Sequence, residues 1–462
     1  MLTSTHLLFA FLTLAAVTAI GIYSMKHIHS AADFALGGRS AGTALLIGAI
    51  AGTIAGGAAT IGTAQMAFQY GLSAWWFTLG AGISCIILGL FLAKPLRESG
   101  MTTGPAFLGQ VYGGQAQAFA SIFSSVGMFL NIIGNVLSGV ALLTSIFGLP
   151  PFTAACIAII LIISYVVFGG VWGAGYVGLF KLTLIYTALL ITGLLAYSMG
   201  GGLAGFRAAL PPQPFFSPFG RGVGTDLAAG FSLLVGIFST QTYLQAIFSA
   251  KDIRVARKAA LISGVITPPI GFAGILAGMY MRIHFPDIPA NEALPLFILN
   301  FLPGWLGGIT LATLLISLVG TAAGLVLGIS TMLTHDIFKR LIYPQATDRQ
   351  VLTFSKAAIV AVAAVALVFA GSNINSVILK WSILSMGLRG ATICLPLLFA
   401  IFCKDFVRPR AGLAAIILAP LTTIFWAAFG SPAIDPLYPG MLVSLAALVA
   451  GSLGQQKRVG SS

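Results

Sequence analysis

Long apolar segments recur along almost the whole chain, and they constrain its fold more than any other feature. Many reach the roughly twenty residues that an α-helix needs to cross the hydrocarbon core of a bilayer. Because 58% of residues are hydrophobic and 7% are charged, a soluble core is excluded. The segment lengths, the many glycines and the lack of alternating strands also exclude a β-barrel. The sequence therefore predicts an all-α polytopic membrane protein.

About thirteen transmembrane helices can be placed, with boundaries read from the apolar runs. The predicted spans are 5–25, 41–66, 71–93, 114–147, 150–168, 174–198, 227–247, 257–282, 303–335, 353–371, 375–402, 411–430 and 437–453. The first basic residue, Lys26, follows the first span, which we therefore interpret as a retained helix rather than a cleaved signal.

The distribution of basic residues predicts the orientation. With the N-terminus outside, only Arg207, Arg221 and Arg282 fall on the outer side, while the seventeen other loop Lys and Arg residues are cytoplasmic. This bias predicts a multi-pass plasma-membrane protein, as in a bacterial inner membrane, with its C-terminus in the cytoplasm. The net charge of +13 then reports topology and contact with lipid headgroups. No nucleic-acid partner is expected.

Three basic residues fall inside predicted spans, namely Lys181, Lys380 and Arg389. All ten carboxylates are interpreted as loop or helix-end residues, so no buried acid is expected to pair with these cations. Lys380 is close enough to the outer end of its span to reach the headgroups. Lys181 either extends to the cytoplasmic surface or has a function, and Arg389, near mid-membrane, either bonds helix-end carbonyls or has a function.

Two stretches of small residues suggest irregular helices. Residues 47–65 can either pack closely against neighbouring helices or break to form a site at mid-membrane. Residues 317–330 place Ser317 and Thr321 on one helix face. Sodium can bind to backbone carbonyls plus a hydroxyl, although most membrane Ser and Thr residues bond their own helix.

Four motifs, in this order, resemble the sodium:solute symporter family. They are ADFALGGRSAG at 32–42, SYVVFGGVWGA at 164–174, YLQAIFSAKDIRVARKAAL at 243–261 and GTAAGLVLGISTMLTHDIFKRL at 320–341. The resemblance implies secondary active transport by alternating access and a leucine-transporter-type core of two inverted five-helix repeats. These repeats would be residues 41–198 and 227–402, preceded by a helix and loop at 1–40 and followed by two helices and a short tail at 411–462.

The resemblance also implies a sodium site between the first and eighth core helices. Its ligands would be the carbonyls of Gly52, Ala55 and Ser317 and the hydroxyl of Thr321. The family usually has two adjacent hydroxyl residues where this chain has Gly320 and Thr321, so one expected ligand is missing.

Further departures concern the fifth core helix and the solute. Gly178 stands where the family usually has Asp, and Lys181 stands where it usually has Gln. Ala59 and Gly236 replace polar residues of the sugar-binding pattern, so a sugar substrate is not expected.

Two hypotheses about Lys181 follow. Its ammonium either replaces sodium as a built-in cation, which would make transport proton-coupled or ion-independent, or sodium still binds and Lys181 acts with Arg389 on an anionic solute. A guanidinium can hold a carboxylate through two parallel hydrogen bonds. We therefore expect a sodium-driven symporter of a small organic anion such as a carboxylate, with the amides near Gly56 and Gly57 assisting.

Other functional classes are less consistent with the sequence. An enzyme is not expected, because the histidines lie outside the span interiors and no acid is predicted to be buried. Cys85, Cys156, Cys394 and Cys403 lack metal-ligand spacing and are interpreted as packing residues. A solute sensor that binds without transport is the alternative to a transporter, and the oligomeric state is left open.

Overall fold

The computed structural model describes residues 2–25, 39–373, 376–404, 406–431 and 434–453, without the side chains of 21, 22, 24, 25, 167–175 and 453. Lys26, the start of the motif at 32–42 and the tail beyond 453 therefore lie outside the described residues. The described chain is helical and contains no strand, apart from an isolated parallel bridge between Ala41 and Ala250.

The first half of the chain contains an early helix, a broken helix and several long helices. Their bounds are α1 Ser4–Met25, α3 Thr43–Ile54, η2 Ala58–Gly62, α4 Thr63–Tyr70, η3 Gly71–Trp75, α5 Trp76–Ile87, η4 Leu88–Leu92, α6 Ala93–Glu98, α7 Gly104–Tyr112, α8 Gly114–Phe147 and α9 Pro151–Met199.

The second half has a second broken helix and a pair of helices at its end. The bounds are α10 Gly202–Ala209, α11 Pro212–Phe215, α12 Val223–Ile237, α13 Gln241–Ser249, α14 Ile253–His284, η5 Ala290–Glu292, α15 Ala293–Phe301, α16 Gly304–Met332, η6 Leu333–Ile342, α17 Asp348–Gly371, α18 Ile378–Phe402, α19 Pro409–Phe429 and α20 Leu437–Leu453.

Most predicted spans coincide with helices, and the differences are specific. The predicted spans 150–168 and 174–198 both fall within α9, and the span 227–247 is divided into α12 and α13. Nine helices of the described chain are long and apolar enough to cross a membrane, and four shorter apolar helices accompany them. The number of spans stays a prediction. The short helices α7 and α15 were not expected, because their apolar runs are too brief to indicate a span.

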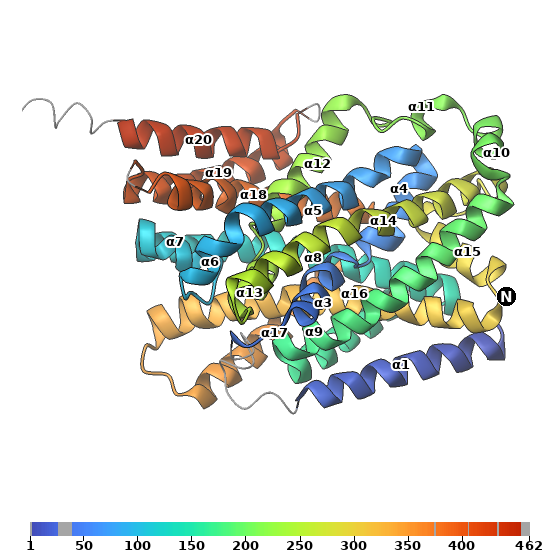
Figure 1. The fold of residues 1–462 in the computed structure, drawn as a ribbon, viewed down its shortest axis with the longest axis horizontal. Helices are drawn as coiled ribbons and strands as arrows, with labels where there is room; N and C mark the ends of the chain where they lie inside the picture. Colours follow the sequence, from blue (N-terminus) through green and yellow to red (C-terminus); the bar gives the residue numbers. More distant parts are fainter. Residues whose placement is uncertain (1, 26–38, 374–375, 405, 432–433, 454–462) are drawn as a thin grey trace, which may run out of the picture.

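Helix α16 lies at the centre of the bundle and contacts α1, α8, α9 and α17 (Figure 1). Glycines allow α9 and α3, which lie beside each other, to pack with their backbones in contact. A Cβ atom at Gly178 of α9 would stand 2.3 Å from the carbonyl oxygen of Gly48 in α3, so the two backbones touch directly. This contact places α9 beside the first helix break.

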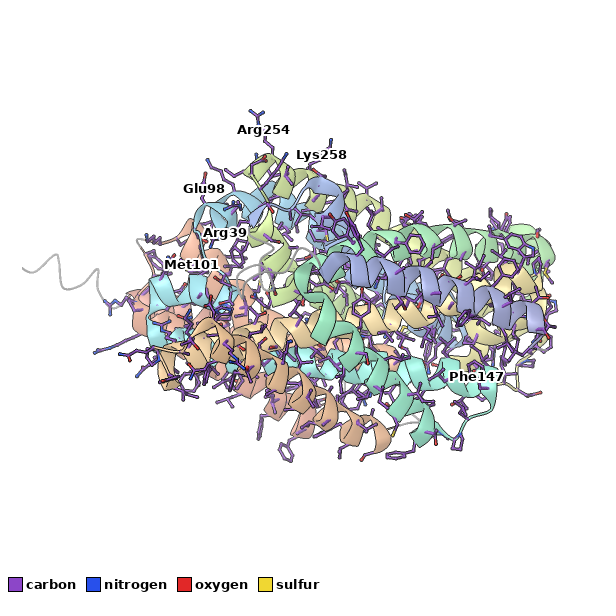
Figure 2. All side chains as sticks on the ribbon, turned by 90° about the horizontal axis from the view of Figure 1, so that it is seen from below. Arg39, Glu98, Met101, Phe147, Arg254 and Lys258 are labelled. Atoms are coloured by element: carbon purple, nitrogen blue, oxygen red, sulfur yellow. The ribbon has the colours of Figure 1, made fainter. Side chains whose placement is uncertain are left out.

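Several basic side chains lie together on one side of the molecule. Figure 2 shows Arg39, Arg254 and Lys258 at one end of the molecule near Glu98, whereas Phe147 lies toward the other end. At the basic end, Ala41 N donates to Ser249 O and Lys251 N donates to Ala41 O, both at 3.1 Å. These bonds join the segment before α3 to the segment after α13.

Candidate functional site

The first helix break lies between α3 and η2. Helix α3 ends at Ile54, and Ala55, Gly56 and Gly57 lead into the π-helical turn of η2. A Cβ atom at Gly56 would lie 2.5 Å from Thr321 Oγ1, and one at Gly57 would lie 2.3 Å from Ser138 Oγ. Only glycine therefore allows this break to sit between α16 and α8. Of the two interpretations of residues 47–65, the structure contains the broken helix.

The backbone amides of this break are already engaged. Gly56 N donates to Ile54 O at 2.7 Å, and Gly57 N donates to the Asn135 side-chain Oδ1 at 3.1 Å. Neither amide predicted to assist an anion is therefore free in this conformation.

A second break, which sequence reasoning missed, separates α12 from α13. Ser239 N and Thr240 N donate to Gly236 O and Ile237 O at 3.2 and 3.1 Å, and Thr240 Oγ1 also donates to Gly236 O. The Ser-Thr pair at 239–240 is the one local signal in the sequence, since hydroxyl side chains compete for helix carbonyls. The two breaks face a common interior.

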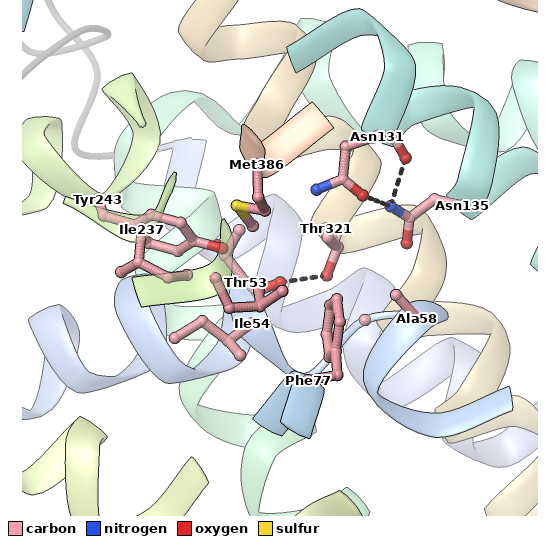
Figure 3. Close-up of a pocket in the computed structure, with 12 residues that line it drawn as sticks. Thr53, Ile54, Ala58, Phe77, Asn131, Asn135, Ile237, Tyr243, Thr321 and Met386 are labelled. Carbon is pink, nitrogen blue, oxygen red and sulfur yellow. Dashed lines mark hydrogen bonds between the residues drawn. The ribbon is translucent and has the colours of Figure 1, made fainter. Parts of the chain in front are cut away.

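A small cavity lies between the two breaks (Figure 3). It is lined by Thr53, Ile54, Gly56, Ala58, Phe77, Asn131, Asn135, Leu233, Ile237, Tyr243, Thr321 and Met386. None of these side chains is charged. The space inside is about 10 Å³, room for roughly one water molecule. A solute can therefore enter only when the surrounding helices move apart.

The predicted sodium ligands converge beside this cavity. Ser317 Oγ donates to the carbonyl of Ala55, and Thr321 Oγ1 donates to the carbonyl of Thr53 at 2.8 Å. Gly52 lies against α9, because a Cβ there would be 2.9 Å from Gly178 O. The four predicted positions thus meet where α3, α9 and α16 are in contact.

The side chain of Lys181 extends into this same place. Its Nζ donates to Ser317 O at 3.1 Å and to Thr321 Oγ1 at 3.4 Å, and the residue is 2% exposed. The alternative in which Lys181 reaches the membrane surface is therefore wrong, whereas Lys380 is exposed as expected. Lys181 and Lys380 differ because α9 packs against α16, where Ser317 and Thr321 offer oxygen acceptors to the Lys181 ammonium.

Arg389 is fully buried on the other side of the cavity. Its Nη1 donates to Thr240 Oγ1 at 2.7 Å, Nη2 donates to Ser385 Oγ at 2.8 Å, and Nε donates to Ser385 O at 3.1 Å. Nη2 also contacts the Met386 sulfur at 3.1 Å. Arg389 itself does not line the cavity, but its neighbour Met386 does. The guanidinium therefore anchors the second break without being part of the cavity lining.

Two acids are buried, which contradicts the expectation of none. Asp336 in η6 accepts hydrogen bonds from Thr103 Oγ1, Gln117 Nε2 and Ser121 Oγ at 2.7 to 3.0 Å. Asp226 is paired with Arg221 at 2.6 Å. All three donors to Asp336 lie over 200 residues away along the chain. The local sequence therefore could not show that hydrogen bonds would compensate for the burial of this carboxylate. Among the described residues, neither acid forms an ion pair with Lys181 or Arg389.

Comparison with known proteins decides the family. A sequence profile described as "Sodium:solute symporter family" matches residues 34–418. The chain belongs to the sodium:solute symporter family. Its members are transporters and not enzymes, and across the described residues no group of three or more potential metal-binding side chains occurs.

Relatives in this family cover nearly the whole chain. The "High-affinity proline transporter PutP" of Bacillus subtilis (strain 168) is 26% identical, covering 92% of this chain and 93% of the relative. The "Sodium/proline symporter" of Escherichia coli (strain K12) is 25% identical, covering 94% and 90%.

A solved structure confirms the predicted fold. A Na⁺-coupled sialic acid symporter in a substrate-bound, outward-open state superposes with a TM-score of 0.83, covering 98% of this chain and 97% of the symporter at 18% identity. The symporter family member described here therefore has the leucine-transporter-type fold expected from the resemblance. Family membership also supports sodium dependence.

Proposed function

We propose that this protein is a secondary active transporter that carries a small organic solute across the membrane by alternating access. The observation that carries this proposal is the small cavity between two helix breaks. Broken helices at mid-membrane are the usual place for solutes in transporters with inverted repeats. The repeats 41–198 and 227–402 are the units that would move, and the helices at 1–40 and 411–462 flank them.

The solute we propose is a small carboxylate. Two buried cations, Lys181 and Arg389, contact residues that line the cavity, and the lining contains no acid. An uncompensated positive field in a low-dielectric interior favours an anion. Proline and sialic acid, named for several relatives and for the structural neighbour, each carry a carboxylate, whereas choline and glucose, named for two other relatives, do not. Gly56 and Gly57 would contribute their amides only if the first break rearranges.

For the ion, we propose that the Lys181 ammonium takes the place of sodium at Gly52, Ala55, Ser317 and Thr321. Its Nζ already bonds the Ser317 carbonyl and the Thr321 hydroxyl. A sodium ion at the same oxygens would be repelled by an ammonium at this distance. Transport would then be independent of sodium at this site, or coupled to protons if Lys181 releases its proton during the cycle.

Sodium-driven symport is the second candidate, and the comparisons favour it. The family and the Na⁺-coupled neighbour support sodium dependence. In this case Lys181 would leave its acceptors on α16 in another conformation, or sodium would bind elsewhere.

The membrane context follows the charge distribution. We propose that the basic end with Arg39, Arg254 and Lys258 faces the cytoplasm, where it meets anionic headgroups, and that the N-terminus lies outside.

Reconstituted liposomes test this function. Uptake of labelled L-proline, L-lactate and pyruvate is measured under a sodium gradient, a potassium gradient and a pH gradient. Uptake that does not respond to replacing sodium by potassium supports Lys181 as the resident cation, and uptake only with sodium supports symport. Binding without uptake would identify a sensor, and the absence of both for all three carboxylates would reject the proposed substrate class.

A further inference from the structure

We infer that Asn131 determines which solutes the cavity accepts, by presenting two N–H donors to the acceptor oxygens of a solute carboxylate. This inference rests on the proposed function, because it concerns the same cavity. It names the atoms that would recognise the carboxylate there: the side-chain Nδ2 of an uncharged residue on α8.

The orientation of the Asn131 amide is fixed by a chain of hydrogen bonds that begins at a backbone group. Gly57 N–H can only donate, and it donates to Asn135 Oδ1 at 3.1 Å. The other end of the Asn135 amide is therefore its nitrogen, which donates to Asn131 O at 2.9 Å and to Asn131 Oδ1 at 3.3 Å. The Asn131 oxygen is thus the end that faces Asn135.

A second donor reinforces the same assignment. Ser382 Oγ on α18 donates to Asn131 Oδ1 at 3.0 Å. With Oδ1 occupied by Asn135 and Ser382, the Asn131 Nδ2 group points away from both and toward the cavity, as Figure 3 shows. An amide whose flip would break this bond network has a defined donor end.

This donor end has no partner in the described chain. Asn131 is 4% exposed, and within the described residues no acceptor lies within hydrogen-bonding distance of its Nδ2. Nδ2 is not among the fully buried atoms that lack a partner, so it faces the cavity, which has room for about one water molecule. A ligand that brings an acceptor oxygen into the cavity would take the place of such a water.

Tyr243 supplies a second group of the same kind. Its side chain lines the cavity from α13 and is 2% exposed, and its hydroxyl makes no hydrogen bond to any described residue. The remaining lining is mostly apolar, with Ile54, Phe77 and Ile237 among its members. The cavity therefore fits a solute with acceptor oxygens at one end and a compact apolar body.

The same geometry disfavours other solute classes. A primary amide NH2 group can donate to a carboxylate oxygen through either N–H but offers no acceptor to an ammonium group. Hydrogen bonds to an ionised carboxylate are also stronger than those to a neutral carbonyl. We therefore expect the transporter to prefer a carboxylate over the corresponding amide.

Paired probes and isosteric variants test the inference. L-Proline, L-lactate and pyruvate, each beside its primary amide, are assayed for stabilisation of the purified protein against heat and for uptake into liposomes. Asn131→Asp keeps the oxygen that Ser382 and Asn135 use but replaces the donors with a negative oxygen. Its matched control is Asn300→Asp, the same change at an exposed position.

For Asn131→Asp we expect the affinity for the preferred carboxylate to fall about tenfold or more. The affinity for the corresponding amide should fall less, so the ratio of carboxylate affinity to amide affinity should decrease or fall below one. Asn131→Leu removes the donors without burying a charge and should also lower carboxylate affinity, which covers the case in which Asn131→Asp does not fold. Asn300→Asp should change neither the carboxylate affinity nor the preference for the carboxylate over the amide.

Two outcomes would overturn the inference, and they are distinguishable. If the wild-type protein binds a carboxylate and Asn131→Leu retains both its affinity and its preference over the amide, Asn131 only holds α8 against α18. The proposed function would survive that result. If the wild-type protein neither binds nor transports any of the three carboxylates, the proposed substrate class and the role of Asn131 fall together.

Discussion

The ammonium of Lys181 occupies space that Gly320 leaves open: a Cβ atom at 320 would stand 3.3 Å from Nζ. Both residues depart from the pattern of the family, and the structure shows that the two departures meet at one point. A larger side chain at 320 would crowd Nζ, which bonds Ser317 O and Thr321 Oγ1 on the same helix. The lost hydroxyl and the gained ammonium are therefore parts of one arrangement.

Removing the ammonium should uncover an ion site. In Lys181→Gln combined with Gly320→Ser, the Ser317 and Thr321 oxygens are released and a second hydroxyl is added. We expect this double variant to melt at a higher temperature in sodium chloride than in potassium chloride, whereas the wild type melts alike in both. Lys380→Gln, which removes an exposed lysine, is the control. An equal salt response in the double variant and the control would refute the replacement of sodium by Lys181.

The first helix break should not tolerate a side chain. Gly56→Ala places a Cβ 2.5 Å from Thr321 Oγ1, so α3 and α16 must separate. We expect a loss of about 1–3 kcal/mol in the free energy of unfolding, together with weaker solute binding. Gly42→Ala is the matched control, because no atom lies within 4 Å of a Cβ there. Similar melting temperatures for the two variants would argue against a tight break.

Asp336 should stabilise the basic end of the bundle. Asp336→Ala leaves the donors of Thr103, Gln117 and Ser121 without their common acceptor. Because each donor left buried without a partner is destabilising by about 1–3 kcal/mol, we expect a marked fall in melting temperature. Hydrogen exchange should also become faster in α7 and the start of α8. Asp287→Ala, at an exposed loop position, should leave both measurements unchanged.

The proposed orientation can be tested by labelling Cys403. This thiol is exposed just after α18, whereas Cys85 and Cys394 are buried. A maleimide that does not cross membranes should label Cys403 in inside-out vesicles and leave it unlabelled in right-side-out vesicles. Cys403→Ser should abolish the signal in inside-out vesicles. Labelling of right-side-out vesicles would reverse the assigned topology.

Asp435, in the loop between α19 and α20, should make stability depend on pH. Burial raises the pKa of this carboxyl, although the Leu437 N–H bond and the nearby Arg221 act in the opposite direction. Because the pKa is higher in the folded state, the protonated form is favoured there, and stability falls as the pH rises from about 4 through the raised pKa. Asp435→Asn should therefore melt above the wild type at pH 7 and like the wild type at low pH. A difference in melting temperature between the variant and the wild type that stays constant with pH would contradict a raised pKa for Asp435.

The sequence alone was sufficient for much of the fold. Apolar length predicted α8 and α20 at their observed bounds, because a helix in lipid must satisfy its own backbone over a fixed thickness. The glycines at 56 and 57 allowed a break to be considered, and the lack of acid beside Lys181 identified that residue as unusual. These signals are local, and each depends on residue type and spacing.

Tertiary structure decided the features that depend on groups far apart in the chain. Lys181 is bonded to α16 rather than extended toward the headgroups because Ser317 and Thr321 come within reach only when α9 packs on α16. The same holds for the break at Ser239 and Thr240, the buried bonds of Asp336 and the free donor end of Asn131. Each depends on groups far along the chain, whose positions cannot be predicted from sequence periodicity. Hydrophobic length determines where a chain crosses lipid, whereas hydrogen-bond geometry between helices determines which polar groups remain for a solute.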